Sequence, residues 1–141
     1  MIARHCGLLL KQLNDVLTKR VNHELKDEAL TVAQMRVLLF LDDYREKQAP
    51  LKDIEKGLAI AQPTVVGLCR RLSEKGFISY LRDSRHHRAK WITLTEEGKG
   101  KCAIAYAHMQ ATERKLLSGM TDAEKKDFYT LLQKALLAMQ K

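Results

Sequence analysis

The 141-residue sequence predicts a mainly helical protein that carries one small β-hairpin. Apolar residues recur at steps of three and four near both ends of the chain, which is the period of an amphipathic helix. Thr31 and Thr121 are each followed three residues later by Gln or Glu, the capping-box pattern that opens a helix. Residues 77–81 and 90–94 are rich in strand-forming side chains and flank a charged segment, which is typical of a hairpin.

The N-terminal half is expected to form three helices. The first covers residues 2–25, and Thr31 opens the second, whose apolar side chains continue to Leu41. A short third helix follows Pro50 and covers Leu51–Leu58. The apolar stripe of the first helix consists of Ile2, Cys6, Leu9, Leu10, Leu13, Val16, Leu17, Val21 and Leu25.

A fourth helix is expected to begin near Pro63, because the missing N–H of proline costs nothing in a first turn. It should run to about Lys75 and end at Gly76. Its core-facing residues are expected to be Val65, Leu68, Cys69 and Leu72. The hairpin strands at residues 77–81 and 90–94 then follow directly.

Two more helices complete the chain. Thr95 caps an alanine-rich helix that ends near Ser118, and Thr121 with Glu124 opens the last one. We expect one structural domain with three regions: residues 1–28 and 97–141 for dimerisation and residues 29–96 for binding. The stripe of the last helix is Phe128, Leu131, Leu132, Ala135, Leu136 and Met139. Because both chain ends carry such stripes, we expect them to pack against a second copy.

Net charge, apolar content and cysteine count indicate which binding partner and which environment to expect. The formal net charge of +8 favours an anionic partner, most simply a nucleic acid. No apolar run reaches the length of a membrane span, so no membrane contact is expected. The three cysteines are odd in number and widely spaced, which indicates a reducing, cytoplasmic environment rather than disulfides.

Residues 51–72 form a helix-turn-helix pattern, whose second helix has the size to lie in the major groove of DNA. Glutamine can read adenine, arginine can read guanine or hold phosphate, and valine can touch a thymine methyl. The residues of the second helix expected to face DNA are Gln62, Pro63, Thr64, Val66, Gly67, Arg70 and Arg71.

With the hairpin added, this pattern becomes a winged helix. The chain resembles the MarR family of bacterial transcriptional regulators through three runs, most closely over residues 31–98. These runs are LTVAQMRVLLFL, LKDIEKGLAIAQPTVVGLCRRLSEKGFI and RDSRHHRAKWITLTEEG. The flanking helices agree in number and placement.

The resemblance implies a homodimer whose two winged helices bind a pseudo-palindromic operator in double-stranded DNA. It also implies a repressor that a small-molecule effector releases, with effector residues that the sequence does not identify. The wing arginine that enters the minor groove corresponds to Arg88, where a narrow groove attracts a cation. Arg85 and Lys90 would contact phosphates on either side.

The sequence departs from the family pattern at several positions. His86 stands where relatives carry the aspartate that braces the wing arginine. Two outcomes follow from this: either Asp83 braces the arginine from the other side of the tip, or the wing is looser. Val66 and Gly67 stand where relatives usually carry polar or basic side chains. Ala61 replaces the usual serine cap, which should weaken the helix start by about 1 kcal/mol.

Two alternatives remain open. Cys6 lies beside Arg4 and His5 near a helix start, where positive potential favours the reactive thiolate of an oxidant sensor. A winged helix can also serve protein–protein contact, with its basic wing merely solvated. No enzymatic activity, cofactor or metal site is expected, because neither nucleophile–base pairs nor metal-ligand spacing occur.

Overall fold

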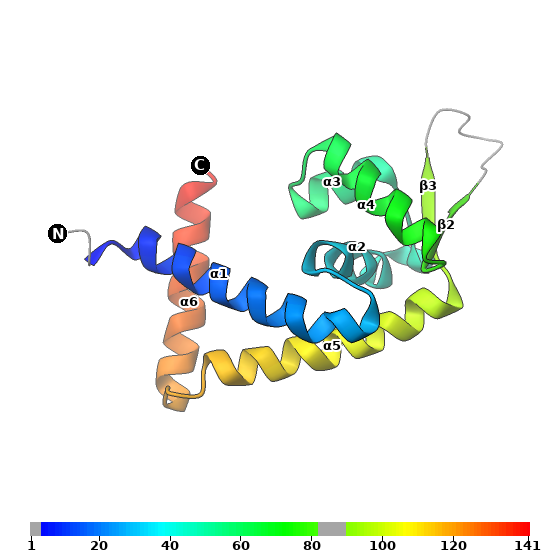
Figure 1. Ribbon diagram of the computed structural model, residues 1–141. Helices are drawn as coiled ribbons and strands as arrows, with labels where there is room; N and C mark the ends of the chain where they lie inside the picture. Colours follow the sequence, from blue (N-terminus) through cyan, green and yellow to red (C-terminus); the bar gives the residue numbers. More distant parts are fainter. Residues whose placement is uncertain (1–3, 82–89) are drawn as a thin grey trace. The chain divides into compact units, whose positions relative to one another are not determined.

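The computed structural model describes residues 4–81 and 90–141 of the chain (Figure 1). Within these ranges, helices dominate and one small antiparallel sheet is present. The helices are α1 (Cys6–Leu25), α2 (Val32–Asp43), α3 (Leu51–Leu58), α4 (Gln62–Glu74), α5 (Glu96–Leu116) and α6 (Asp122–Met139). Two short 3₁₀ helices, η2 (Lys26–Glu28) and η3 (Arg45–Lys47), and strands β1 (Gln48–Pro50), β2 (Ile78–Leu81) and β3 (Trp91–Leu94) complete the order.

Helix α1 begins later than the sequence predicts. His5 has an extended backbone, with φ −87° and ψ 115°, and its side chain makes no capping hydrogen bond. The α-helix therefore starts at Cys6 rather than at residue 2, and Ile2 lies outside the described residues. Of the predicted apolar face, Val21 and Leu25 are buried. Without a capping residue, the periodicity does not define the first turn.

Helix α2 begins as predicted, at a complete capping box. The Gln34 N–H donates to Thr31 Oγ1, and the Thr31 N–H donates to Gln34 Oε1, both over 3.2 Å. The Val32 N–H donates over 2.8 Å to Asn22 Oδ1 on α1. The side chains of α1 and α2 thus satisfy donors that a helix N-terminus leaves free.

One hydrophobic core unites α2, α3, α4 and the sheet. Leu38, Leu41, Ile54 and Leu72 are fully buried at its centre. The predicted core face of α4 is confirmed, since Val65, Leu68, Cys69 and Leu72 are all buried. This packing fixes α3 and α4 against α2, which leaves their opposite faces at the surface.

The sheet has three strands, in the order β1-β3-β2, and all its pairs are antiparallel. The two hairpin strands were predicted, but β1 was not. Ala49 of β1 pairs with Ile92 of β3, and both side chains are fully buried. A three-residue strand that ends in proline carries no alternating pattern, so only its pairing reveals it.

The joint between β3 and α5 is one residue long. Thr95 Oγ1 donates to the Gly76 carbonyl over 2.6 Å and accepts the Gly98 N–H over 3.1 Å. A Cβ at Gly98 would lie 2.0 Å from the Phe77 carbonyl oxygen, so only glycine allows this close approach. Gly76 ends the α4 segment with φ +82°, a conformation that glycine adopts without strain.

By spatial contacts, the chain divides into two compact units, residues 1–109 and 110–141. The second unit holds the end of α5 and all of α6. Helix α6 begins at the predicted capping box, in which the Glu124 N–H donates to Thr121 Oγ1 and the Thr121 N–H to Glu124 Oε1. Its apolar side chains Leu131, Leu136 and Met139 are exposed.

Candidate nucleic-acid interface

Helices α3 and α4 form a helix-turn-helix unit with a tight connection. Ala59 ends α3 in the left-handed conformation, with φ 54° and ψ 45°, and Ile60 N–H donates to the Glu55 carbonyl over 3.2 Å. Ala61 then starts α4 with an extended backbone and no side-chain cap, as predicted. Pro63 lies in the first turn of α4, where it removes no helical hydrogen bond. The two helices are therefore set by the turn and the core beneath them.

The outer face of α4 presents the residues that the sequence predicts to face DNA. Opposite its buried stripe, Val66 and Gly67 are half-buried in the middle of the helix. The other predicted residues are exposed, namely Gln62, Pro63, Thr64, Arg70 and Arg71. The structure thus gathers all seven on one helix and turns them away from the core.

A groove of about 510 Å³ lies beside the start of α4. It brings together three predicted residues, Gln62, Val66 and Lys90, with Lys52 and Glu55 of α3. Pro50 and Leu51 complete its lining. Lys52 and Glu55 were not predicted as site residues, although both are polar positions of an amphipathic helix whose apolar side is Leu51, Ile54 and Leu58.

Lys90 is held at this groove by the backbone. The N–H of Leu51, the first residue of α3, donates over 2.9 Å to the Lys90 carbonyl oxygen. The Lys90 side chain is exposed just before β3, as is that of Lys52 on α3. The base of the predicted wing and the helix-turn-helix unit therefore share one edge.

Unpaired positive charge gathers on this surface. Within residues 4–81 and 90–141, Lys52, Arg70, Arg71 and Lys90 take part in none of the ion pairs. By contrast, Lys47 and Lys101 elsewhere on the molecule are paired with Asp42 and Glu28. Cations without a carboxylate partner remain available to an external anion.

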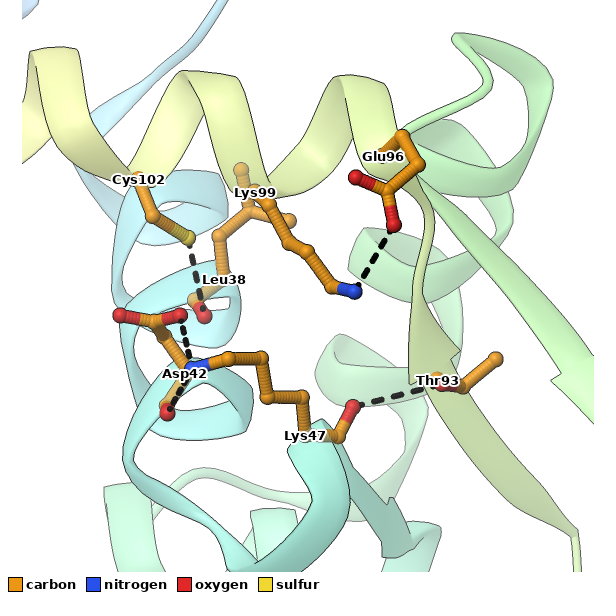
Figure 2. A network of polar contacts seen from close by, with 7 residues as sticks. All are labelled: Leu38, Asp42, Lys47, Thr93, Glu96, Lys99 and Cys102. Carbon is orange, nitrogen blue, oxygen red and sulfur yellow. Dashed lines mark hydrogen bonds and ion pairs between the residues drawn. The ribbon is translucent and has the colours of Figure 1, made fainter.

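A polar network supports the sheet behind this surface (Figure 2). Lys47 Nζ donates to both the carbonyl oxygen and Oδ1 of Asp42, over 3.0 and 2.8 Å. Its own carbonyl accepts from Thr93 Oγ1 over 3.4 Å. Lys47 and Glu46 are both left-handed, with φ of 54° and 57°. The side-chain bonds of Lys47 therefore hold a strained turn that delivers β1 to β3.

A second set of bonds fixes the far end of α4. Lys75 Nζ donates to Gln34 Oε1 over 2.9 Å and also to the Ala29 carbonyl. Gln34 is itself part of the α2 capping box, which the Asn22 bond to Val32 connects to α1. The C-terminus of α4 is thus tied through side chains to the start of α2 and to α1.

The three cysteines fall into two environments. Cys6, the first residue of α1, is exposed, and neighbouring Arg4 and His5 are exposed as well. Burial raises the pKa of the Cys69 thiol and of the Cys102 thiol to about 11. Cys69 packs in the core, and Cys102 Sγ donates over 3.5 Å to the Leu38 carbonyl (Figure 2). Both are buried in the core, as predicted for Cys69.

The predicted tip of the wing lies outside the described residues. This applies to the proposed groove arginine Arg88, its neighbour Arg85 and the bracing pair Asp83 and His86. In the described ranges, no cluster of three His, Cys, Asp or Glu side chains is placed to hold a metal ion. No helix there is both long and apolar enough to cross a membrane.

Comparison with known sequences agrees with this geometry. The sequence model of the MarR family matches residues 30–89, which hold α2 to β2 and the segment after it. The uncharacterized HTH-type transcriptional regulator YwhA of Bacillus subtilis is 28% identical over 138 residues, covering 92% of this chain and 96% of that protein. Over residues 30–89 the chain is therefore similar to regulators of the MarR family.

Solved structures of the MarR fold superpose on nearly the whole chain. MepR of S. aureus, in complex with DNA, has a TM-score of 0.89 at 24% identity, over 95% of this chain and 98% of that one. BpsR of Bordetella bronchiseptica, whose DNA binding 6-hydroxynicotinic acid regulates, has a TM-score of 0.81 at 27% identity. That match covers 92% of this chain and 96% of BpsR. The predicted winged-helix fold is therefore confirmed.

Proposed function

We propose that this chain is a regulator of the MarR family, which binds double-stranded DNA sequence-specifically and represses transcription until a small molecule releases it. The observation that carries the proposal is the outer face of α4. It presents hydrogen-bonding, apolar and cationic side chains together, next to the exposed cations Lys52 and Lys90. This combination suits a helix in the major groove flanked by phosphate contacts. The chain acts in the cytoplasm, as a regulator and not as an enzyme.

Each side chain on this surface has a role that its chemistry supports. Gln62 reads a base edge near the start of α4, and Val66 contacts a thymine methyl. Lys52 and Lys90, on the two walls of the groove, bind phosphates and set the register. Arg70 and Arg71, one turn further along α4, hold guanine or phosphate.

The regulator acts as a homodimer on a pseudo-palindromic operator. Exposed leucines and valine on α1, together with exposed apolar residues on α6, support a second copy as the partner of both helices. They are Leu8, Leu9, Leu10, Val16, Leu131, Leu136, Leu137 and Met139. Two α4 helices must then lie about one DNA turn apart, roughly 34–36 Å.

A small-molecule effector releases the operator by favouring a dimer with the wrong spacing. Such a ligand acts only through its different affinity for the two states of the dimer. The regulation of BpsR by 6-hydroxynicotinic acid supports an aromatic acid as the effector class. We assign no effector residues.

The proposal is tested by selecting duplexes from a random DNA library with the full-length protein. We expect a pseudo-palindrome to be enriched and its affinity to fall steeply as salt rises, because bound cations release counterions. Arg70→Ala should weaken binding, and the salt slope should fall by about one if Arg70 contacts phosphate. Filter binding or fluorescence anisotropy measures both.

Arg36→Ala is the matched control. Arg36 is exposed on α2, so this substitution removes one positive charge away from the proposed DNA-binding face. It should leave the enriched sequence and its salt slope unchanged. If no duplex is enriched, or if binding is insensitive to salt, the alternative of protein–protein contact replaces the proposal.

The exposure of Cys6 favours a second candidate, an oxidant as the releasing signal. Cys6 is the one thiol of the chain that is open to solvent in the structure. Oxidation there would act on α1, one of the helices assigned to the dimer. A Cys6→Ser variant that still leaves DNA on peroxide treatment would remove this candidate.

A further inference from the structure

Helix α4 carries a glycine in its interior, where glycine destabilises a helix. Gly67 is the sixth of 13 residues in α4, and glycine is the weakest helix former apart from proline. Helix α4 also lacks a side-chain cap at Ala61, so no capping hydrogen bond at its N-terminus offsets the low helix propensity of Gly67. A glycine at its centre therefore needs a reason.

Packing inside the molecule supplies that reason at Gly98 and Gly57 but not at Gly67. An added Cβ would lie 2.0 Å from a backbone oxygen at Gly98 and 2.1 Å from the Phe40 ring at Gly57. At Gly67, no heavy atom of the described chain lies within 4 Å of an added Cβ, apart from the two neighbouring residues and the nearby backbone of α4 itself. Packing within the described chain therefore does not explain this glycine.

The surroundings of Gly67 identify what approaches it. On a helix surface the neighbours lie three and four residues away, here Pro63 and Thr64 on one side and Arg70 and Arg71 on the other. All four are exposed and belong to the proposed DNA-reading face. Bare backbone thus lies at the centre of that face, beside the half-buried Val66.

We propose that Gly67 determines specificity by letting α4 approach the base edges closely. Glycine is used where backbone must come near a ligand, because it has no Cβ to hold the ligand away. The closer approach brings the short Val66 side chain within contact of a thymine methyl in the major groove. This inference rests on the proposed function and refines it, predicting a thymine opposite Val66.

The first test compares two alanine variants on the selected operator duplex. Gly67→Ala should raise the thermal midpoint, because alanine is the better helix former, and yet weaken operator affinity tenfold or more. Gly100→Ala on α5 is the matched control, since Gly100 also has open space around an added Cβ. It should raise the midpoint without changing affinity.

The second test replaces each operator thymine in turn by deoxyuridine, which removes only the methyl group. One position in each half-site should cost the wild type several-fold in affinity. Val66→Ala and Gly67→Ala should each lose most of that discrimination. The inference is overturned if Gly67→Ala binds as tightly as the wild type, or if no thymine methyl matters.

These outcomes are distinct from failure of the proposed function. If the wild type selects no duplex at all, the DNA-binding proposal itself is wrong. If the wild type binds its operator and Gly67→Ala binds equally well, only the role of Gly67 is wrong.

Discussion

At the scale of single residues, burial divides the three thiols by reactivity. Cysteine reacts as its thiolate, and the pKa values of about 11 at Cys69 and Cys102 keep both protonated at neutral pH. Reactivity at these two sites should rise only as pH approaches that value. Cys6, at the start of α1, is exposed to a reagent in solution.

We therefore expect one fast-reacting thiol in the native protein at pH 7 and three after denaturation. Labelling with a maleimide, followed by mass spectrometry of peptides, counts and locates them. Cys6→Ser should abolish the fast phase and leave the slow ones unchanged. Fast labelling of Cys69 or Cys102 would show that the core around α4 or α5 opens readily.

At the scale of elements, the start of α4 is the weak point of the interface. The Ala61 backbone already has the extended conformation of an N-cap, with φ −62° and ψ 145°, but no side-chain oxygen accepts the free N–H groups. The N-terminal turn that carries Gln62 and Thr64 is consequently held by backbone alone.

Ala61→Ser should supply the missing acceptor and stabilise the fold by about 1 kcal/mol. Urea unfolding, followed by circular dichroism, measures the change. Ala103→Ser is the control, because Ala103 is exposed in the interior of α5, where serine has a lower helix propensity than alanine. Equal effects at the two positions would contradict the capping explanation.

Most elements could be predicted because their signals are local. The capping boxes at Thr31 and Thr121, the proline in the first turn of α4 and the glycine after it are read within a few residues. Strand β1 could not be predicted, since it exists through pairing with β3, more than 40 residues away in sequence. The first turn of α1 was misplaced because no cap marks it.

The candidate site divides in the same way. Outward residues of α4 follow from helical periodicity once the core face is known, as Gln62 and Arg70 illustrate. Lys52 and Glu55 were missed, because they join the site only when α3 packs beside α4. The open space around Gly67 depends on the tertiary structure and cannot be predicted from a sequence pattern.

At the scale of the whole molecule, apolar surface remains uncovered. Leu131 and Leu136 on α6 are 60% and 59% exposed, and Val16 on α1 is 67% exposed. Exposed apolar side chains along a helix mark an interface in soluble proteins. In the proposed homodimer, these residues contact the second copy.

Leu136→Glu should convert the dimer into a monomer with unchanged helix content, because it buries a charge in the proposed interface. Sedimentation velocity gives the mass, and operator affinity should fall at least a hundredfold, since one half-site is lost. Thr130→Glu adds the same charge off the apolar stripe of α6 and should remain dimeric. A monomeric wild type at micromolar concentration would refute the assignment.

Because Thr95 alone connects β3 to α5, the number of residues in this connection is as constrained as their identity. Between β3 and α5 there is no slack, because Thr95 bonds to Gly76 and Gly98 and the Gly98 backbone touches Phe77. Each added residue would turn all of α5 by about 100° relative to the sheet. Insertions and deletions at this position would therefore reorient the entire helix, so the length of this joint matters as much as the residues in it.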